Sequence, residues 1–241
     1  MSNFKILSSP SASYIRLLPM KKLTQLLLAS TAALGISNAA TVSVSAAAPA
    51  VDGADIANDN GAADLGGDQG HMWSNRPHQG QSFTTGSNTT GYTMTSVTLK
   101  NLNNTISNGP TFNVVVGTLA GSTLTQIGST ETGVSPNYVP LDYITFTFDT
   151  PLNLDANTEY AFLWGSAGAG FVTVNNADDS TFSGGTAISS GDNNVPDLAN
   201  VLDRVGDRVF HVNLTANAIP EPSSALLGLA GLALAVRRRR S

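Results

Sequence analysis

The chain has 241 residues, of which 41% are hydrophobic and 12% are charged, with 23 glycines, 11 prolines and no cysteine. This length suits one domain with processing segments at its ends, and the absence of cysteine excludes a disulfide framework and thiol catalysis. Between Ala40 and Pro222, four basic residues face all 17 acidic residues, so this part carries a net charge of −13. Such a surface repels phosphate backbones, and we expect no nucleic acid among the partners of the protein.

A secretory signal peptide is predicted for residues 1–39. Lys21 and Lys22 precede an apolar, leucine-rich run that ends at Ile36. The next three residues, Ser37-Asn38-Ala39, place small side chains at a cleavage site for signal peptidase. A buried amphipathic helix is the alternative. Clustered leucines between a basic pair and a small-residue site are, however, typical of a leader peptide.

Two details of this leader stay open. Met20 stands directly before the lysine pair and is a second candidate for the start of translation, with residues 1–19 upstream of it. We place cleavage after Ala39, with the Ala46–Ala48 stretch as the second choice. Either choice implies export through the secretory translocon and processing by signal peptidase.

Residues 40–70 are predicted to be an irregular acidic linker, because they are rich in Ala, Gly, Asp and Asn and show no sustained periodicity. His71, Arg76 and His78 follow closely, in front of the first predicted strand. Two histidines alone lack the third ligand and the spacing of a metal site. We interpret this stretch as a solvated loop whose Trp73 packs on the domain.

A β-domain is predicted for residues 71–215. Eight runs of four to eight residues alternate in polarity or are rich in β-branched side chains, and turn-forming residues separate them without an intervening helical period. These runs are 81–84, 92–99, 111–116, 123–127, 143–148, 159–164, 171–174 and 208–214.

The run 143–148 shows the alternation most clearly. Its tyrosine and two threonines lie on one face of a strand, whereas Ile144, Phe146 and Phe148 lie on the other. The sequence therefore predicts an all-β fold, an antiparallel β-sandwich and more specifically a jelly roll. A signal peptide and a short hydrophobic C-terminal helix are expected to flank it.

Two tryptophans raise the possibility of carbohydrate binding. The rings of Trp73 and Trp164 could form a platform for sugar rings, since aromatic faces beside amides suit carbohydrates. Packing in the core or at its rim is the simpler interpretation of both.

Calcium is the cofactor that the sequence leaves open. The acidic clusters at 52–68, 178–179 and 192–197 contain the oxygen ligands that calcium prefers. None of them matches an EF-hand loop, because Ile56 occupies the first acidic position that the Asn-Asp-Asn-Gly stretch at 58–61 would require. Solvated turns are the simpler interpretation, and we expect no cofactor.

Catalysis is not indicated by any motif. Asp155 and Glu159 could be written as a glycosidase pair, but among 17 acidic residues some pair always has a suggestive spacing. The chain contains no nucleophile elbow, phosphate loop or zinc-binding helix. A matrix-modifying hydrolase is therefore the least favoured alternative.

The last 22 residues, 220–241, are predicted to be a sorting tail behind a short linker at 216–219. Two prolines separated by one residue cannot continue a helix, so the apolar segment covers residues 223–236. Its 14 residues give about 21 Å of helix, less than the roughly 30 Å hydrocarbon core, which favours a transient anchor. The residues that stop this anchor on the cytoplasmic side are Arg237, Arg238, Arg239 and Arg240.

This order of features resembles the PEP-CTERM sorting signal of Gram-negative bacteria. The resemblance implies that an exosortase, a membrane-embedded transpeptidase-like enzyme, recognises Pro220, Glu221 and Pro222 and cleaves near them. The chain would be the substrate of that enzyme. The run from Gly80 to Trp164 also looks like the β-sandwich ectodomains that commonly precede such tails, and an ordinary tail anchor is the alternative.

The expected function is that of an exported, non-enzymatic protein of the cell surface or exopolysaccharide matrix of a biofilm. The inner membrane would hold it only briefly, with the acidic domain outside. A carbohydrate- or calcium-binding module is the alternative.

Overall fold

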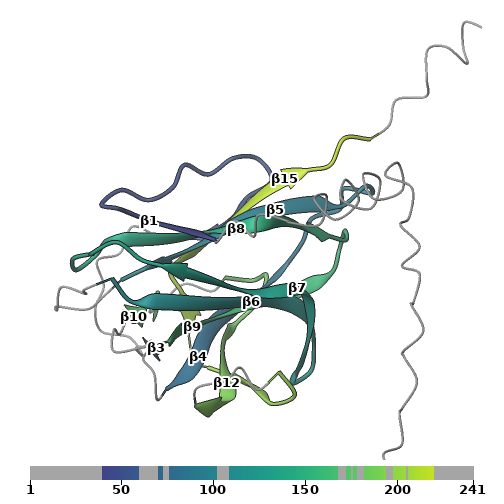
Figure 1. The fold of residues 1–241 in the computed structure, drawn as a ribbon. Helices are drawn as coiled ribbons and strands as arrows, with labels where there is room; N and C mark the ends of the chain where they lie inside the picture. Colours follow the sequence, from purple (N-terminus) through teal and green to yellow (C-terminus); the bar gives the residue numbers. More distant parts are fainter. Residues whose placement is uncertain are drawn as a thin grey trace, which may run out of the picture. The chain divides into compact units, whose positions relative to one another are not determined.

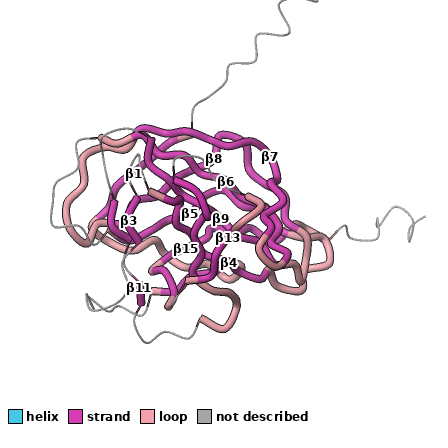
Figure 2. Tube along the Cα trace, turned by 90° about the horizontal axis from the view of Figure 1, so that it is seen from below, coloured by secondary structure: helices cyan, strands magenta, loops and turns pink. Residues whose placement is uncertain are grey.

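A computed structural model describes residues 40–59, 70–72, 76–101, 109–167, 172–174, 176–177, 182–193, 198–204 and 206–219. The predicted signal peptide and sorting tail lie outside these residues, as does Trp73. All regular structure in the described part of the chain is β-strand (Figure 2). The all-β prediction is confirmed.

Two antiparallel sheets form a sandwich, which Figure 1 shows as two layers. The five-stranded sheet has the order β1-β8-β5-β15-β2 and the six-stranded sheet the order β13-β12-β4-β9-β6-β7. Two short ribbons, β10-β3 and β11-β14, complete the pairing. The strands are β1 Thr41–Ser45, β2 Ile56–Asn58, β3 Gly70–Met72, β4 Pro77–Thr84, β5 Tyr92–Lys100, β6 Thr111–Ala120, β7 Thr123–Val134, β8 Tyr143–Leu154, β9 Glu159–Ala167, β10 Val172–Val174, β11 Asn176–Ala177, β12 Ala187–Asn193, β13 Val201–Asp203, β14 Asp207–Arg208 and β15 Phe210–Ala216.

The main core lies between the two sheets and is built by alternation along the strands. In β8, Ile144, Phe146 and Phe148 are buried as the sequence predicts. In β9, Phe162 and Trp164 point into the same core, where the Trp164 ring meets aromatic side chains from both sheets.

The six-stranded sheet also buries part of its other face. A second cluster, which includes Val115, Leu163 and Ile188, lies there. Two backbone hydrogen bonds connect the β13 side of this sheet to the β7 side, from Leu124 N to Leu198 O at 2.7 Å and from Val201 N to Ser122 O at 2.8 Å. Because the outer edges of the sheet are joined in this way, the sheet curls around the second cluster.

Each of the eight predicted runs contains a strand, but the prediction of an irregular linker at 40–70 is wrong in two places. Residues Thr41–Ser45 pair with β8, and Ile56–Asn58 pair with β15, so both segments extend the five-stranded sheet. These strands are five and three residues long, and their partners lie far away in the sequence. Neighbouring strands, rather than local pattern, therefore stabilise them.

The predicted solvated loop before the first strand is also wrong at His78. This residue lies in β4 and is 3% exposed. Because the sheet curls, both faces of β4 are covered, and six successive residues of the strand, 78–83, are buried.

Candidate functional site

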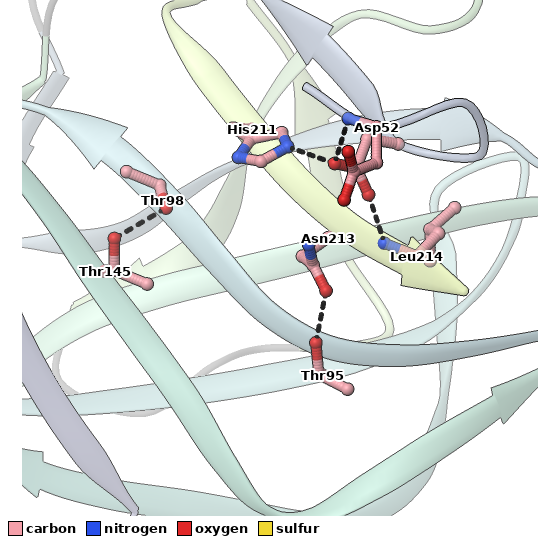
Figure 3. A network of polar contacts seen from close by, with 8 residues as sticks. Asp52, Thr95, Thr98, Thr145, His211, Asn213 and Leu214 are labelled. Carbon is pink, nitrogen blue, oxygen red and sulfur yellow. Dashed lines mark hydrogen bonds and ion pairs between the residues drawn. The ribbon is translucent and has the colours of Figure 1, made fainter. Parts of the chain in front are cut away.

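The outer face of the five-stranded sheet carries a row of polar side chains, shown in Figure 3. The hydroxyls of Thr98 and Thr145 lie 2.8 Å apart, and Thr95 Oγ1 donates to Asn213 Oδ1 at 2.5 Å. Thr95 and Thr98 lie on β5, Thr145 lies on β8 and Asn213 lies on β15. His211 belongs to the same face, because it lies between the core residues Phe210 and Val212 on β15.

The connection between β1 and β2 lies against this face and is fastened there by Asp55. Its Oδ2 is 3.0 Å from His211 Nε2 and accepts from Asp52 N at 2.8 Å, while its Oδ1 accepts from Leu214 N at 2.7 Å. The Asp55 side chain is 0% exposed and the His211 side chain 7%. Since a carboxylate only accepts, His211 Nε2 is the donor of this hydrogen bond.

A second acidic contact lies next to the first. The Tyr143 hydroxyl donates to Asp59 Oδ2 at 2.6 Å. Burial raises the pKa of Tyr143 above its usual range, and the hydrogen bond to Asp59 and its charge add to this effect. The phenol therefore stays protonated at neutral pH. Lys100 Nζ lies 5.0 Å from the centre of the Tyr143 ring, within range of a cation–π contact.

These pairs border a pocket of about 210 Å³. Its apolar wall comes largely from the β1–β2 connection, and its polar wall comes from the outer face of the sheet. The lining residues are Ala48, Pro49, Val51, Ala57, Asp59, Tyr143, Phe210 and His211.

An aspartate that orients a histidine makes up two of the three residues of a hydrolase triad. Among the described residues, no hydroxyl group forms a hydrogen bond with His211. The polar residues that line the pocket are Asp59, Tyr143 and His211.

A buried polar network lies near one end of the main core. Gln81 donates to Asp207 Oδ1 at 2.8 Å and accepts from Arg208 N at 2.9 Å. Gln79 accepts from Arg208 Nη2 at 2.7 Å. Asp207 also accepts from Phe182 N at 3.0 Å. Because these groups bond to one another, they hold β14 against β4.

Two buried polar groups contrast with that network. Both ring nitrogens of His78 and Nε1 of Trp164 are buried without a hydrogen-bond partner. Burial lowers the pKa of His78 from 6.5 to about 4, so the ring is neutral at pH 7.

The structure removes Trp164 as a candidate sugar platform. Its side chain is 1% exposed, and the Phe112 and Phe146 rings pack against it at centroid distances of 5.3 and 5.8 Å. No ring face is open to a ligand, so the packing interpretation is correct for this residue. Trp73 lies outside the described residues.

The remaining sequence-predicted sites are not brought together in the described fold. Ala39, the Pro220–Pro222 motif and the arginines at 237–240 lie outside the described residues. Within the described ranges, no group of three or more His, Asp or Glu side chains is placed to hold a metal ion. The calcium alternative therefore gains no support from this part of the chain.

Comparison with protein-family models, with curated proteins and with solved structures gives no match. The described geometry defines the class of the protein: an all-β sandwich of two antiparallel sheets with a small surface pocket beside the β1–β2 connection.

Proposed function

We propose that this chain is an exported protein of the cell surface or exopolysaccharide matrix, sorted and C-terminally processed by an exosortase, with a structural or adhesive role. The observation that carries the proposal is the order of features at the C-terminus: Pro220-Glu221-Pro222, then a mostly apolar segment of 14 residues, then four arginines. A tail anchor needs no Pro-Glu-Pro motif and is normally longer.

The described domain is compatible with this role. The last described strand ends at Ala216, four residues before the motif, so a cut near Pro220 leaves this strand complete. In the described residues no helix is long and apolar enough to cross a membrane.

We further classify the sandwich as a jelly roll. The chain changes sheet between β4 and β5, between β5 and β6, between β7 and β8, and between β8 and β9. Repeated crossing between two sheets is the feature that jelly rolls share, and it supports this finer description.

Mass spectrometry of the mature protein tests the sorting proposal. In cells that contain the exosortase we expect a C-terminus close to Pro220, and in cells without it a chain intact through Ser241. Intact chains in both strains would exclude the proposal.

Two variants separate the motif from the domain. Glu221→Ala is expected to leave the tail uncut, because it removes the only charged side chain of the motif. Glu159→Ala is the matched control, since it removes a carboxylate from an exposed position on β9 and should be processed normally. Equal processing of both variants would show that Glu221 is not recognised.

A further inference from the structure

We propose that β1 is a docking edge for a second copy of this chain, which pairs with it antiparallel and joins two five-stranded sheets into one. This inference rests on the described strands and does not depend on the sorting proposal. Within the described part of the chain, β1 pairs with β8 on one side and with no strand on the other. Alternate residues of an edge strand turn their N–H and C=O groups away from the sheet, so β1 offers backbone donors and acceptors to a further strand.

The other outer strands of the two sheets are protected against such pairing. β2 and β13 are only three residues long, and β13 is also tied to the β7 side of its sheet through the bond from Val201 N to Ser122 O. β7 carries the charged Glu131, whose Oε2 accepts from Asp149 N at 2.7 Å. The pairing of β7 with β6 is irregular around Gly128, which has a φ of 65°. Short length, charge and bulges are the features by which sheet edges avoid pairing.

β1 has none of these protective features. It is five residues long, keeps an unbroken register with β8 from Thr41 to Ser45, and contains neither proline nor a charged side chain. All residues from 40 to 51 are uncharged, so the net charge of −13 between Ala40 and Pro222 comes from the rest of that stretch. Two copies can therefore pair along β1 without placing like charges opposite each other.

The sequence of β1, Thr-Val-Ser-Val-Ser, is complementary to itself in an antiparallel pair centred on Ser43. Ser43 then lies opposite the same residue of the second copy, and Val42 lies opposite Val44. Thr41 lies opposite Ser45 in the same arrangement. Hydroxyl side chains meet on one face of the pair and valines meet on the other. An interface with two-fold symmetry requires a self-complementary surface of this kind.

Both faces of the sheet gain from this pairing. On the inner face, Val44 is half-buried against the main core, and a valine of the second copy covers more of its surface. On the outer face, Ser43 is the last member of a row of facing residues that runs through Thr145 and Thr98. Hydroxyl side chains on facing strands stabilise a sheet, and Ser43 of the second copy continues this row.

Cysteine cross-linking of the full chain in mild detergent tests the dimer. The contact involves five residues of each copy, against roughly 20–30 in a stable interface, so the pair is weak and is best trapped covalently. The chain has no native cysteine to interfere. Ser43→Cys places two thiols on residues whose Cα atoms lie about 4.5–5.5 Å apart, a separation that a disulfide can span.

Ser129→Cys is the matched control, because it makes the same change at an exposed position on β7. Under mild oxidation we expect disulfide-linked dimers to form at least about tenfold faster for Ser43→Cys than for Ser129→Cys. Equal rates for the two variants would overturn the proposal.

The register of the pair gives a second, independent test. Thr41 faces Ser45 of the second copy, whereas the two Thr41 residues lie about 14 Å apart along the strands. Thr41→Cys and Ser45→Cys should therefore cross-link slowly alone and at least about tenfold faster when the two variants are mixed. Association through the predicted leader or tail would give no gain on mixing, and that result would refute pairing at β1. Thermal unfolding midpoints check that each variant folds, and all three positions on β1 are exposed.

Discussion

His78 should make the stability of the domain depend on pH. The side chain is 3% exposed, and neither of its ring nitrogens has a hydrogen-bond partner. The ring lies so close to Gly165 that a Cβ added there would be 2.2 Å from His78 Nε2. The ring therefore packs directly against the β9 backbone, and burial lowers its pKa from 6.5 to about 4.

The sign of the effect follows from that lowered pKa. As the pH falls, the unfolded chain takes up the proton before the folded chain does, so protonation favours unfolding. The loss of stability begins near pH 6.5 and is complete near pH 4, where His78 of the folded protein is protonated as well. A pKa difference of about 2.5, at about 1.4 kcal/mol for each pKa unit, gives a loss of about 3 kcal/mol.

His78→Leu tests this, because leucine has a similar volume and cannot take up a proton. Urea unfolding followed by tryptophan fluorescence, with the buried Trp164 as a reporter, gives the free energy of unfolding between pH 7 and pH 4. The free energy of unfolding of the variant, relative to that of the natural protein, should rise by about 3 kcal/mol as the pH falls from 7 to 4.

Thr98→Val is the control, since it changes a buried polar side chain that does not titrate. Its hydrogen bond to Thr145 is lost at every pH, so its cost of about 1 kcal/mol should stay constant. If the curve for His78→Leu also ran parallel to that of the natural protein, the buried, neutral state of His78 would be refuted.

Three further changes test other contacts by urea unfolding at pH 7. Gly165→Ala should lower the free energy of unfolding by about 2 kcal/mol, because its Cβ clashes with the His78 ring. Adding His78→Ala to this variant should recover most of that loss. If the costs of the two substitutions were additive, the contact between the two residues would be contradicted. Asp55→Ala should cost about 3 kcal/mol, because it leaves three N–H groups without their acceptor, and a cost near zero would show that the β1–β2 connection is not fastened there. Val42→Ala should lower the free energy of unfolding by about 2 kcal/mol, with exposed Thr41→Ala as the neutral control; no cost would mean that Val42 does not pack in the core.

The sandwich could be predicted from the sequence because most of its strands are half buried. Alternation in the runs at 92–99 and 143–148 reports one core face directly, and both runs became strands. The same reasoning could have placed Trp164 in the core, since it shares a face of β9 with Tyr160 and Phe162. The prediction went wrong at β4, whose polar residues are buried on both faces by the curled sheet.

The pocket, by contrast, had no local signal. Asp55 and His211 are 156 positions apart, and Asp59 and Tyr143 are 84 apart. Both aspartates lie in a stretch whose composition is typical of a linker, and their side chains gain their roles only when β2 pairs with β15. A pair of this kind can be found from one sequence only after the sheet order is known.

The boundaries of the domain bear on where the chain is processed. Ala40 and Val42 are buried in the main core, and β1 begins at Thr41, two residues after the preferred cleavage site at Ala39. Cleavage within Ala46–Ala48 would remove all of β1, strip these side chains from the core and leave β8 as an uncovered edge. A cut after Ala39 leaves β1 complete, and a cut near Pro220 leaves β15 complete. If the proposed leader is removed, a cut after Ala39 keeps the five-stranded sheet complete, whereas a cut within Ala46–Ala48 does not, so the stability of the described domain favours Ala39 over the second choice.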